Sequence, residues 1–443
     1  MKQYDNYKNS GVEWLGEIPE HWEVKKMKFI GNIYAGINGK KGDDFSKEYS
    51  DGIKSFIPFT NICNNIKIDD NQYQYVKISE NENQNRVKKN DILFLMSSET
   101  LDDIAKNSIY LGENTELYLN SFCKGFRISK HNVNAEFVNY LFLSTTYRNY
   151  FSLVGRGFTR INLKQEFIND AYALLPKLKE QTAIANFLDN KTTKIDQAIA
   201  IKQQQIALLQ ERRQILIHKA VTRGLNENVK LKDSGVEWIG EIPEHWEVKK
   251  LGYLTNKIGD GLHGTPNYTD GTEFYFINGN NLSTGNIEIT ELTKTVSERE
   301  YLIHKKELTD KTLLLSINGT IGNVAFYCGE KVMLGKSAAY LNFYKNINIE
   351  YVKCFLESTV FKNYYELQLS GSTINNFSLY SIGKTPVTFP NKIEQKQIVE
   401  YIKTSKTKIA TAISLKEQEI VKLKEYKMSL IDGVVTGKVR VIS

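Results

Sequence analysis

The feature that most constrains this chain is that it contains the same long pattern twice. Ser10–Lys26 and Ser234–Lys250 are identical at sixteen of seventeen positions, 224 residues apart. A second block, Pro176–Thr222, matches Pro390–Thr436 at an offset of 214. Such a unit is too long for a solenoid, whose repeats run to about 45 residues. The sequence therefore predicts a duplicated domain pair.

The two copies share their ends and differ in their middles. If the middles bind something, the sequence predicts that they bind two different things. We predict four segments: a shared segment plus recognition domain at 1–173, a helix at 174–225, the repeated segment plus second domain at 226–387, and a distal helix at 388–443.

The second shared block predicts a long helix in each copy. Residues 178–221 contain no proline or glycine, and apolar residues recur at alternating spacings of three and four. The predicted seams are Ile195, Ile199, Ile206, Leu209 and Leu216 in the first helix and Ile409, Ile413, Ile420, Leu423 and Leu430 in the second. Polar residues interrupt both seams at matching places, which is a known way to fix register.

Matching seams favour an antiparallel coiled coil of two helices, each about 65 Å long at ~1.5 Å per residue. The two domains would then lie at opposite ends, a fixed distance apart. The alternative is that each helix packs on its own domain.

The middles indicate an α+β fold with two mixed, sheet-rich domains. Short runs rich in β-branched and aromatic residues are punctuated by Gly, Asn and Asp. The predicted strands include 56–59, 73–78, 91–96 and 122–128 in the first middle and 274–277, 312–317, 324–327 and 338–343 in the second. One helix is predicted in each, at Ala135–Tyr150 and Ile349–Tyr365.

The net charge of +7 permits nucleic-acid binding without establishing it. Residues 174–232 carry eleven Lys/Arg against five Asp/Glu, and residues 388–443 eleven against six. The middles are almost neutral: residues 31–173 carry seventeen of each sign, and 251–387 twelve against thirteen. The excess thus lies on the predicted helices, which either follow DNA phosphates or present a docking face to partner proteins.

Candidate DNA contacts are basic residues and amide- or hydroxyl-rich loops, since Asn suits adenine and Lys or Arg suit guanine and phosphate. Turn formation is the competing explanation for the Asn-Gly pairs. The candidates are Lys40, Lys41, Lys88, Lys89, Arg156, Arg160, Asn278, Asn280, Asn281, Asn318, Thr320, Lys336, Asn375 and Asn376.

Several enzyme classes lack their motifs. The chain has no Pro-Pro for an adenine methyltransferase loop, and Gly335-Lys336-Ser337 lies one residue too far from Gly329 for a nucleotide-binding loop. The four cysteines have no zinc spacing, and no metal site is predicted. No apolar run approaches the ~18 residues of a membrane span, and residues 1–10 have no signal-peptide core. We therefore expect a non-catalytic cytoplasmic protein.

The repeated W-L/I-G-E-I-P-E-H-W segment and the P-x-x-x-E-Q-x-x-I helix entry, duplicated around two divergent regions, resemble the specificity subunit of Type I restriction-modification enzymes. Asp260–Pro266 and Ile317–Gly322 resemble motifs of that family's target recognition domains, which adds His263 and Thr265 to the candidates.

The resemblance implies a subunit that reads an asymmetric, bipartite site on double-stranded DNA from the major groove. It implies two modification (methyltransferase) subunits docked on the helices, joined in some complexes by two restriction subunits. S-adenosylmethionine, ATP and magnesium would be bound by those partners and not by this chain. The alternatives are a two-module scaffold that binds no DNA, a fused enzyme with its own chemistry, and an orphan specificity subunit.

Overall fold

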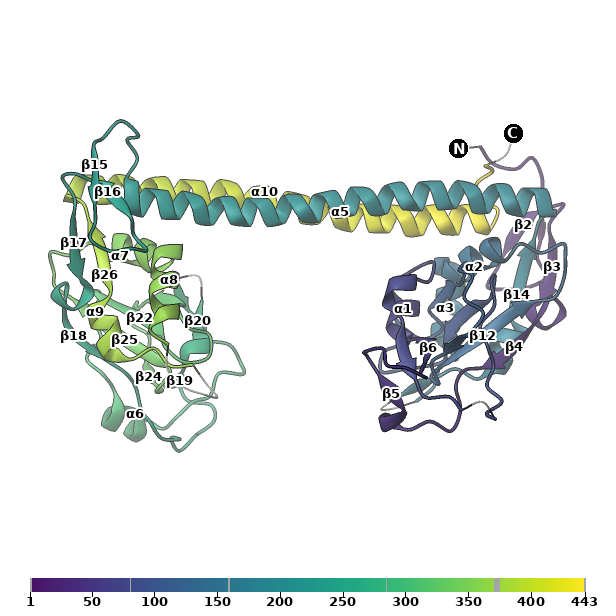
Figure 1. Ribbon diagram of the computed structural model, residues 1–443, viewed down its shortest axis with the longest axis horizontal. Coiled ribbons are helices and arrows are strands. Elements are labelled where there is room, and N and C mark those ends of the chain that lie inside the picture. The colour runs from purple at the N-terminus through teal and green to yellow at the C-terminus, as the bar shows by residue number, and fades with distance from the viewer. Residues whose placement is uncertain (1, 80, 158–159, 284, 370–374, 442–443) are drawn as a thin grey trace. The chain divides into compact units, whose positions relative to one another are not determined.

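The computed structural model describes residues 2–79, 81–157, 160–283, 285–369 and 375–441. It divides into two compact units: unit 1 contains residues 1–202 and 417–443, and unit 2 contains residues 203–416. Two long helices, α5 (Leu178–Arg223) and α10 (Lys392–Val435), each contribute to both units without a break (Figure 1). The helix predicted from residue 178 therefore begins where the sequence places it.

Unit 1 is built on an antiparallel sheet with strand order β10-β8-β12-β4. Its strands are β4 (Gly31–Ala35), β8 (Ile92–Leu95), β10 (Asn107–Ile109) and β12 (Cys123–Ile128). A second sheet has the order β11-β6-β7-β5, in which β11 runs parallel to β6. Its strands are β5 (Phe45–Ser46), β6 (Lys54–Ile57), β7 (Gln74–Val76) and β11 (Leu117–Leu119).

Unit 2 repeats this plan. Its antiparallel sheet has the order β18-β25-β22-β23, formed by β18 (Thr255–Gly259), β22 (Thr312–Ser316), β23 (Val324–Phe326) and β25 (Ala338–Phe343). A parallel pair, β19 (Tyr275–Ile277) and β24 (Val332–Leu334), corresponds to β6 and β11. The predicted mixture of helix and sheet is thus confirmed in both units, and the divergent middles share the order of the antiparallel sheet and the parallel strand pair.

The prediction of a single helix in each middle is wrong. Unit 1 has α2 (Ala135–Leu143) and α3 (Thr145–Val154), and unit 2 has α7 (Ile349–Leu356) and α8 (Thr359–Leu367). The break falls at Ser144 and Ser358, each of which has extended backbone and occupies the N-cap position of the following helix, although only the Ser358 side chain makes a capping hydrogen bond. Serine is favoured at this position because its short polar side chain satisfies free N–H groups, as that of Ser358 does for Phe361.

The remaining elements include the shared segments, which pair with the ends of the middles: β3 (Glu23–Lys26) with β14 (Tyr172–Leu175), and β17 (Glu247–Lys250) with β26 (Pro386–Phe389). The others are β1 (Tyr7–Asn9), β2 (Glu17–Pro19), α1 (Phe59–Asn64), β9 (Ser97–Ser98), β13 (Ile161–Asn162), α4 (Gln165–Asp170), β15 (Leu231–Asp233), β16 (Glu241–Pro243), β20 (Leu282–Ser283), β21 (Asn286–Ile287), α6 (Glu298–His304) and α9 (Leu379–Lys384). Short 3-10 turns occupy 27–29, 42–44, 70–72, 251–253 and 279–281.

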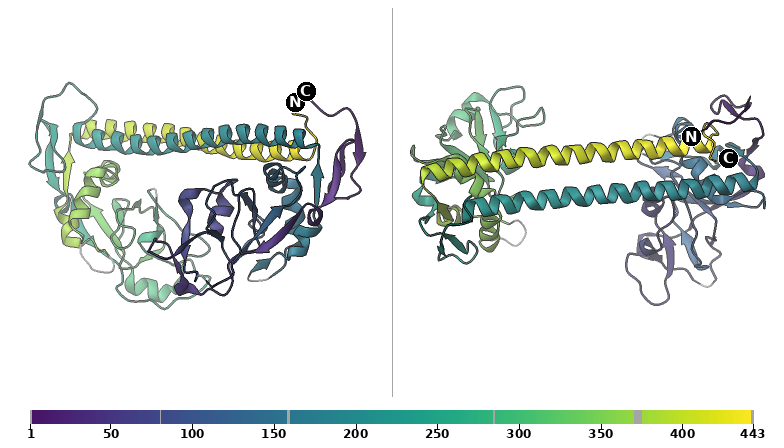
Figure 2. Two further views of the ribbon diagram at one scale, coloured as in Figure 1. Left: turned by 45° about the vertical axis from the view of Figure 1, so that its right-hand side comes forward. Right: turned by 90° about the horizontal axis from the view of Figure 1, so that it is seen from above.

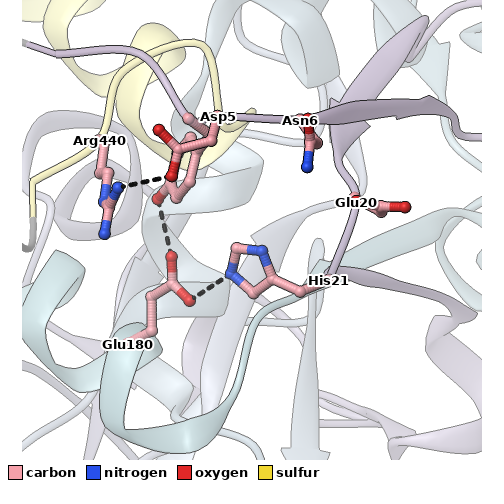
Figure 3. A pocket seen from close by; sticks show the side chains of 7 residues that line it. Asp5, Asn6, Glu20, His21, Glu180 and Arg440 are labelled. Atoms are coloured by element: carbon pink, nitrogen blue, oxygen red, sulfur yellow. Dashed lines mark hydrogen bonds and ion pairs between the residues drawn. The ribbon is translucent and has the colours of Figure 1, made fainter.

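The repeated sequence motifs lie together at the start of each long helix. In unit 1, Glu180 accepts hydrogen bonds from the Tyr4 hydroxyl (2.7 Å) and from the indole Nε1 of the buried Trp22 (3.4 Å). His21 Nε2 lies 2.9 Å from the same carboxylate (Figure 3). Arg440 contacts Asp5, and both line a pocket together with Tyr4, His21 and Glu180. These contacts explain why E-H-W and E-Q occur together in both copies.

Unit 2 repeats the arrangement, with Trp246 Nε1 donating to Glu394 (3.2 Å) and His245 beside the same carboxylate (2.9 Å). The glutamine that follows ties the first turn of the helix to the segment before it: Gln181 Nε2 donates to the carbonyl of Pro176 at 2.7 Å, and Gln395 Nε2 donates to that of Pro390 at 2.8 Å. The repeated E-H-W and E-Q motifs therefore attach the start of each long helix to its own unit.

The long helices run antiparallel within unit 1 (Figure 2). Lys427 of α10 pairs with Asp196 of α5 at 2.7 Å, and Lys202 pairs with Glu419. Ile195 and Ile199 are buried beside these pairs. In unit 2, Ile217, Ala220 and Val221 of α5 share one core with Ile398 and Ile402 of α10. Lys202 and Lys427, which interrupt the apolar seam in unit 1, thus each form an ion pair with a carboxylate of the opposite helix.

Candidate nucleic-acid interface

In unit 2, several loops at one edge are joined to a single turn, Gly335–Ser337, between β24 and β25. The N–H of Gly335 donates to Ile277 at the end of β19 (2.8 Å), and Ile317, which follows β22, donates to the carbonyl of Ser337 (3.0 Å). Leu262, which follows β18, donates to Leu334 (2.7 Å). Asn318 forms a β-bridge with Asn376, which attaches a further loop.

Two glycines allow these segments to approach so closely. A Cβ on Gly261 would lie 2.0 Å from the carbonyl oxygen of Leu334, and one on Gly335 would lie 2.2 Å from Oδ1 of Asn278. Neither position needs a left-handed backbone, so the requirement is for space. The Asp260–Pro266 motif thus lies against the central turn.

Unit 1 has the same hydrogen-bond framework around the turn Asn120–Phe122. Ile37 donates to Leu119 (2.8 Å), Asn120 donates to Ile57 (3.1 Å), and Met96 donates to Phe122 (2.9 Å). A Cβ on Gly36 would meet the Asn120 carbonyl oxygen at 2.2 Å, as at Gly261 in unit 2. The frameworks therefore match residue by residue, although the two sequences do not: Ser121 corresponds to Lys336, and Phe122 to Ser337.

The structure brings the unit 2 candidates together at this edge. The exposed ones are His263, Thr265, Asn280, Thr320, Lys336 and Asn375, and the half-buried ones are Asn278, Asn281, Asn318 and Asn376.

Two of these amides are already used by the fold. Asn281 accepts from the N–H of Asn278 (2.9 Å) and donates to the carbonyl of Glu288 (3.2 Å), while Asn278 Oδ1 accepts from Ser337 Oγ (2.9 Å). His263 pairs with Asp260 at 2.8 Å. The Asn281 amide is therefore accounted for by the hydrogen bonds of its own turn, although Asn281 is not itself part of an Asn-Gly pair.

In unit 1, the candidates at the corresponding edge are Lys40, Lys41, Arg156 and Arg160. Lys40 is held by Glu82 at 2.5 Å, and this hydrogen bond is the main reason that the pKa of Glu82 falls to about 2. Arg156 donates to the backbone carbonyls of Leu153 and Gly155 at the end of α3. Lys41 and Arg160 are exposed.

Lys88 and Lys89 lie elsewhere. They precede β8, whereas the loop edge follows it, so the strand separates them from the other candidates. Both residues are exposed, and Lys89 pairs with Glu113. Within the loop that contains them, the backbone N–H of Lys88 donates to the buried carboxylate of Asp91 at 2.7 Å. The same carboxylate also accepts from Tyr34 and Arg127. Burial and the charge of Asp91 raise the pKa of Tyr34.

Sequence reasoning missed two aromatic residues at the unit 1 edge. Phe59 and Phe122 are 43% and 39% exposed, and the guanidinium of Arg160 lies 4.5 Å from the centre of the Phe122 ring. A guanidinium over a ring face is a cation–π contact that orients both groups. In the sequence, these two residues are marked only by their position next to a turn. The buried Phe56 also lies next to a turn, so this position does not distinguish exposed aromatic residues from buried ones.

No group of three or more His, Cys, Asp or Glu side chains is placed to hold a metal ion within the described ranges. None of the helices in the described part of the chain is long and apolar enough to cross a membrane. The candidate DNA contacts that the structure brings together are those at the loop edge of each unit.

Comparison with known proteins supports this interpretation. The family described as Type I restriction modification DNA specificity domain matches twice, over residues 19–211 and 243–425. The chain is 26% identical over 447 residues to a putative type I restriction enzyme MjaX specificity subunit of Methanocaldococcus jannaschii, covering 99% of this chain and 97% of that protein. It is 25% identical over 318 residues to the EcoKI specificity subunit of Escherichia coli, covering 71% of this chain and 65% of that protein.

Two solved structures share the fold. One, titled as the structural basis of complex assembly and conformational transition of the type I R-M system, aligns with a TM-score of 0.69 at 14% identity over 95% of this chain and 99% of that one. The HsdS subunit from Thermoanaerobacter tengcongensis aligns with a TM-score of 0.51 at 12% identity, covering 95% and 98%. With two matched domains that together span most of its length, this chain belongs to the Type I restriction-modification specificity family.

Proposed function

We propose that this chain reads DNA sequence as the specificity subunit of a Type I restriction-modification complex, and that each loop edge reads one half of a bipartite site. The observation that carries the proposal is the shared framework: two units hold the same loops with the same backbone hydrogen bonds and place different side chains on them. Fixed backbones with variable exposed side chains suit the reading of base edges in the major groove.

The two half-sites should be unlike, because equivalent positions carry different chemistry. Ser121 of unit 1 corresponds to Lys336 of unit 2, and Ser97 corresponds to Asn318. A hydroxyl, an ammonium and an amide prefer different donor and acceptor patterns on bases. An asymmetric target follows from this difference.

The helix pair would set the gap between the half-sites and bind the partner subunits. α5 leaves Ile201, Leu208 and Ile215, each seven residues apart, between 47% and 56% exposed, and α10 leaves Leu415 54% exposed. Apolar stripes on a helix are suited to packing against further helices. We assign this face to two modification subunits, with two restriction subunits added in complexes that cleave DNA.

The chain itself would perform no chemistry. Methyl transfer and cleavage, with their S-adenosylmethionine, ATP and magnesium, belong to the partners in this proposal. The role also implies that the protein works in the cytoplasm, where the DNA of a prokaryotic cell lies. The relatives are named as specificity subunits, which agrees with this division of labour.

The test is methylome sequencing of a host that expresses this chain with its neighbouring modification subunit. A split methylated motif that disappears when the chain is deleted would support the proposal. A palindromic motif would contradict the unlike half-sites. If purified chain and partners bind no duplex at any sequence, the two-module scaffold is the better account.

A further inference from the structure

The turn at the centre of the unit 2 edge carries one side chain that makes no hydrogen bond or ion pair within the described ranges. Gly335 has no side chain, and Ser337 Oγ donates to Asn278 and accepts from the N–H of Gly279, both at 2.9 Å. Lys336, between them, is exposed, and no carboxylate in the described part of the chain pairs with it.

The backbone beneath Lys336 is held on every side. The turn is closed by a 3.0 Å bond from Ala338 to the carbonyl of Gly335, and neighbouring loops bond to it through Ile277, Ile317 and Leu262. When the backbone of a long side chain is already fixed, less conformational entropy is lost when the end of that side chain binds a ligand. The ammonium is therefore presented from a rigid base and not from a loose loop.

The surroundings also favour an electronegative ligand. The segments that meet at the edge are 260–266, 278–281, 317–320, 335–337 and 375–376, and Lys336 is their only lysine or arginine. Their only carboxylate is Asp260, which is engaged with His263 at 2.8 Å. The other exposed groups are amides and hydroxyls, which carry no net charge, so Lys336 is the main source of positive charge in these segments.

We propose that Lys336 is a specificity-determining residue that selects a guanine in the half-site read by unit 2. Guanine offers two acceptors, O6 and N7, on its major-groove edge, and a lysine ammonium has three donors and no acceptor. The proposal rests on the DNA-reading function proposed above. In unit 1 the same place is occupied by Ser121, so the preference belongs to one half of the target only.

The experiment is methylome sequencing of K336S beside the wild type, both expressed with the modification subunit. The expected result is that a single guanine in one half of the motif becomes degenerate, with discrimination at that base falling roughly 5- to 150-fold in competition binding. The other half should not change. The thermal midpoint should stay at the wild-type value, because the Lys336 side chain has no partner among the residues that the structure describes.

Lys331 provides a matched control, because it flanks the other end of the same strand, β24, where it pairs with Glu273. K331S should leave the motif unchanged. Three results would overturn the inference: an unchanged motif in K336S, relaxation at a base other than guanine, or a uniform loss of affinity at all sequences, which marks a phosphate contact. If the wild type itself yields no motif, it is the proposed function that fails.

Discussion

Glu357 is predicted to be the most costly single charge to remove from unit 2. Its carboxylate contacts Lys353 Nζ at 2.6 Å and Lys406 Nζ at 2.9 Å, and thereby ties the end of α7 to α10. The side chains of Lys353 and Glu357 are only 11% and 18% exposed. A buried pair that loses one partner leaves an uncompensated charge, which costs about 3–5 kcal/mol.

We expect Glu357→Gln to lie near the lower limit, about 3 kcal/mol, because Lys406 is partly exposed and can be hydrated. For a unit of this size that corresponds to a fall of roughly 6–12 °C in Tm. Differential scanning calorimetry of the full chain is the measurement. Glu366→Gln, which breaks an exposed pair with Lys362, should cost less than ~0.5 kcal/mol.

The pH dependence has a definite sign. Burial alone would raise the pKa of Glu357, but the charges of Lys353 and Lys406 outweigh it and hold the pKa below its ordinary value of 4.5. A depressed folded-state pKa gives stability that is present above the ordinary value and is lost as pH falls through the folded value. The Tm difference between wild type and Glu357→Gln should therefore be constant near neutral pH and shrink below about pH 4.5.

A combined Lys353→Met and Glu357→Leu variant should recover at least half of the loss, because it removes both buried charges together. Unit 1 has no such ions at the equivalent positions, which are Asn139 and Leu143. If Glu357→Gln destabilised the chain no more than Glu366→Gln does, the argument from a buried charge would be refuted.

Gly261→Ala should abolish recognition of one half-site and lower Tm, since its Cβ would meet the backbone of β24 at 2.0 Å, whereas Gly264→Ala, with no described atom within 4 Å of its Cβ, should leave Tm unchanged. Glu394→Ala leaves the buried Trp246 indole without its acceptor and should cost about 1–3 kcal/mol in denaturant titrations; an unchanged midpoint would refute this. Leu208→Asp should weaken association with the modification subunit in light scattering without changing Tm, and a lower Tm would show that this face is part of the fold.

The sequence was most informative for elements whose pattern of apolar residues alone determines the secondary structure. The helix over residues 178–221 was predictable from its apolar spacing, and β25 begins and ends at the residues predicted for it. The helix breaks at Ser144 and Ser358 were not, because an apolar stripe on both sides of a serine also fits one continuous helix.

The loop edge could be predicted in kind but not in detail. Asn and Lys residues signalled polar loops, but their order in space depends on the parallel strand pairs, which have no local signature. That Ser121 corresponds to Lys336 follows from hydrogen-bond register alone. Likewise, nothing in the sequence distinguishes Asn281, whose amide is used by its own turn, from the exposed Asn280.

The central claim is that each unit reads one half of an asymmetric DNA site, and the most direct test is an exchange of one middle. Residues 251–387 would be replaced by the corresponding region of another family member, and the methylome would be sequenced with the same modification subunit. The account predicts a new split motif in which one half is changed and the other half is retained. A motif that changes in both halves, or in neither, would contradict it.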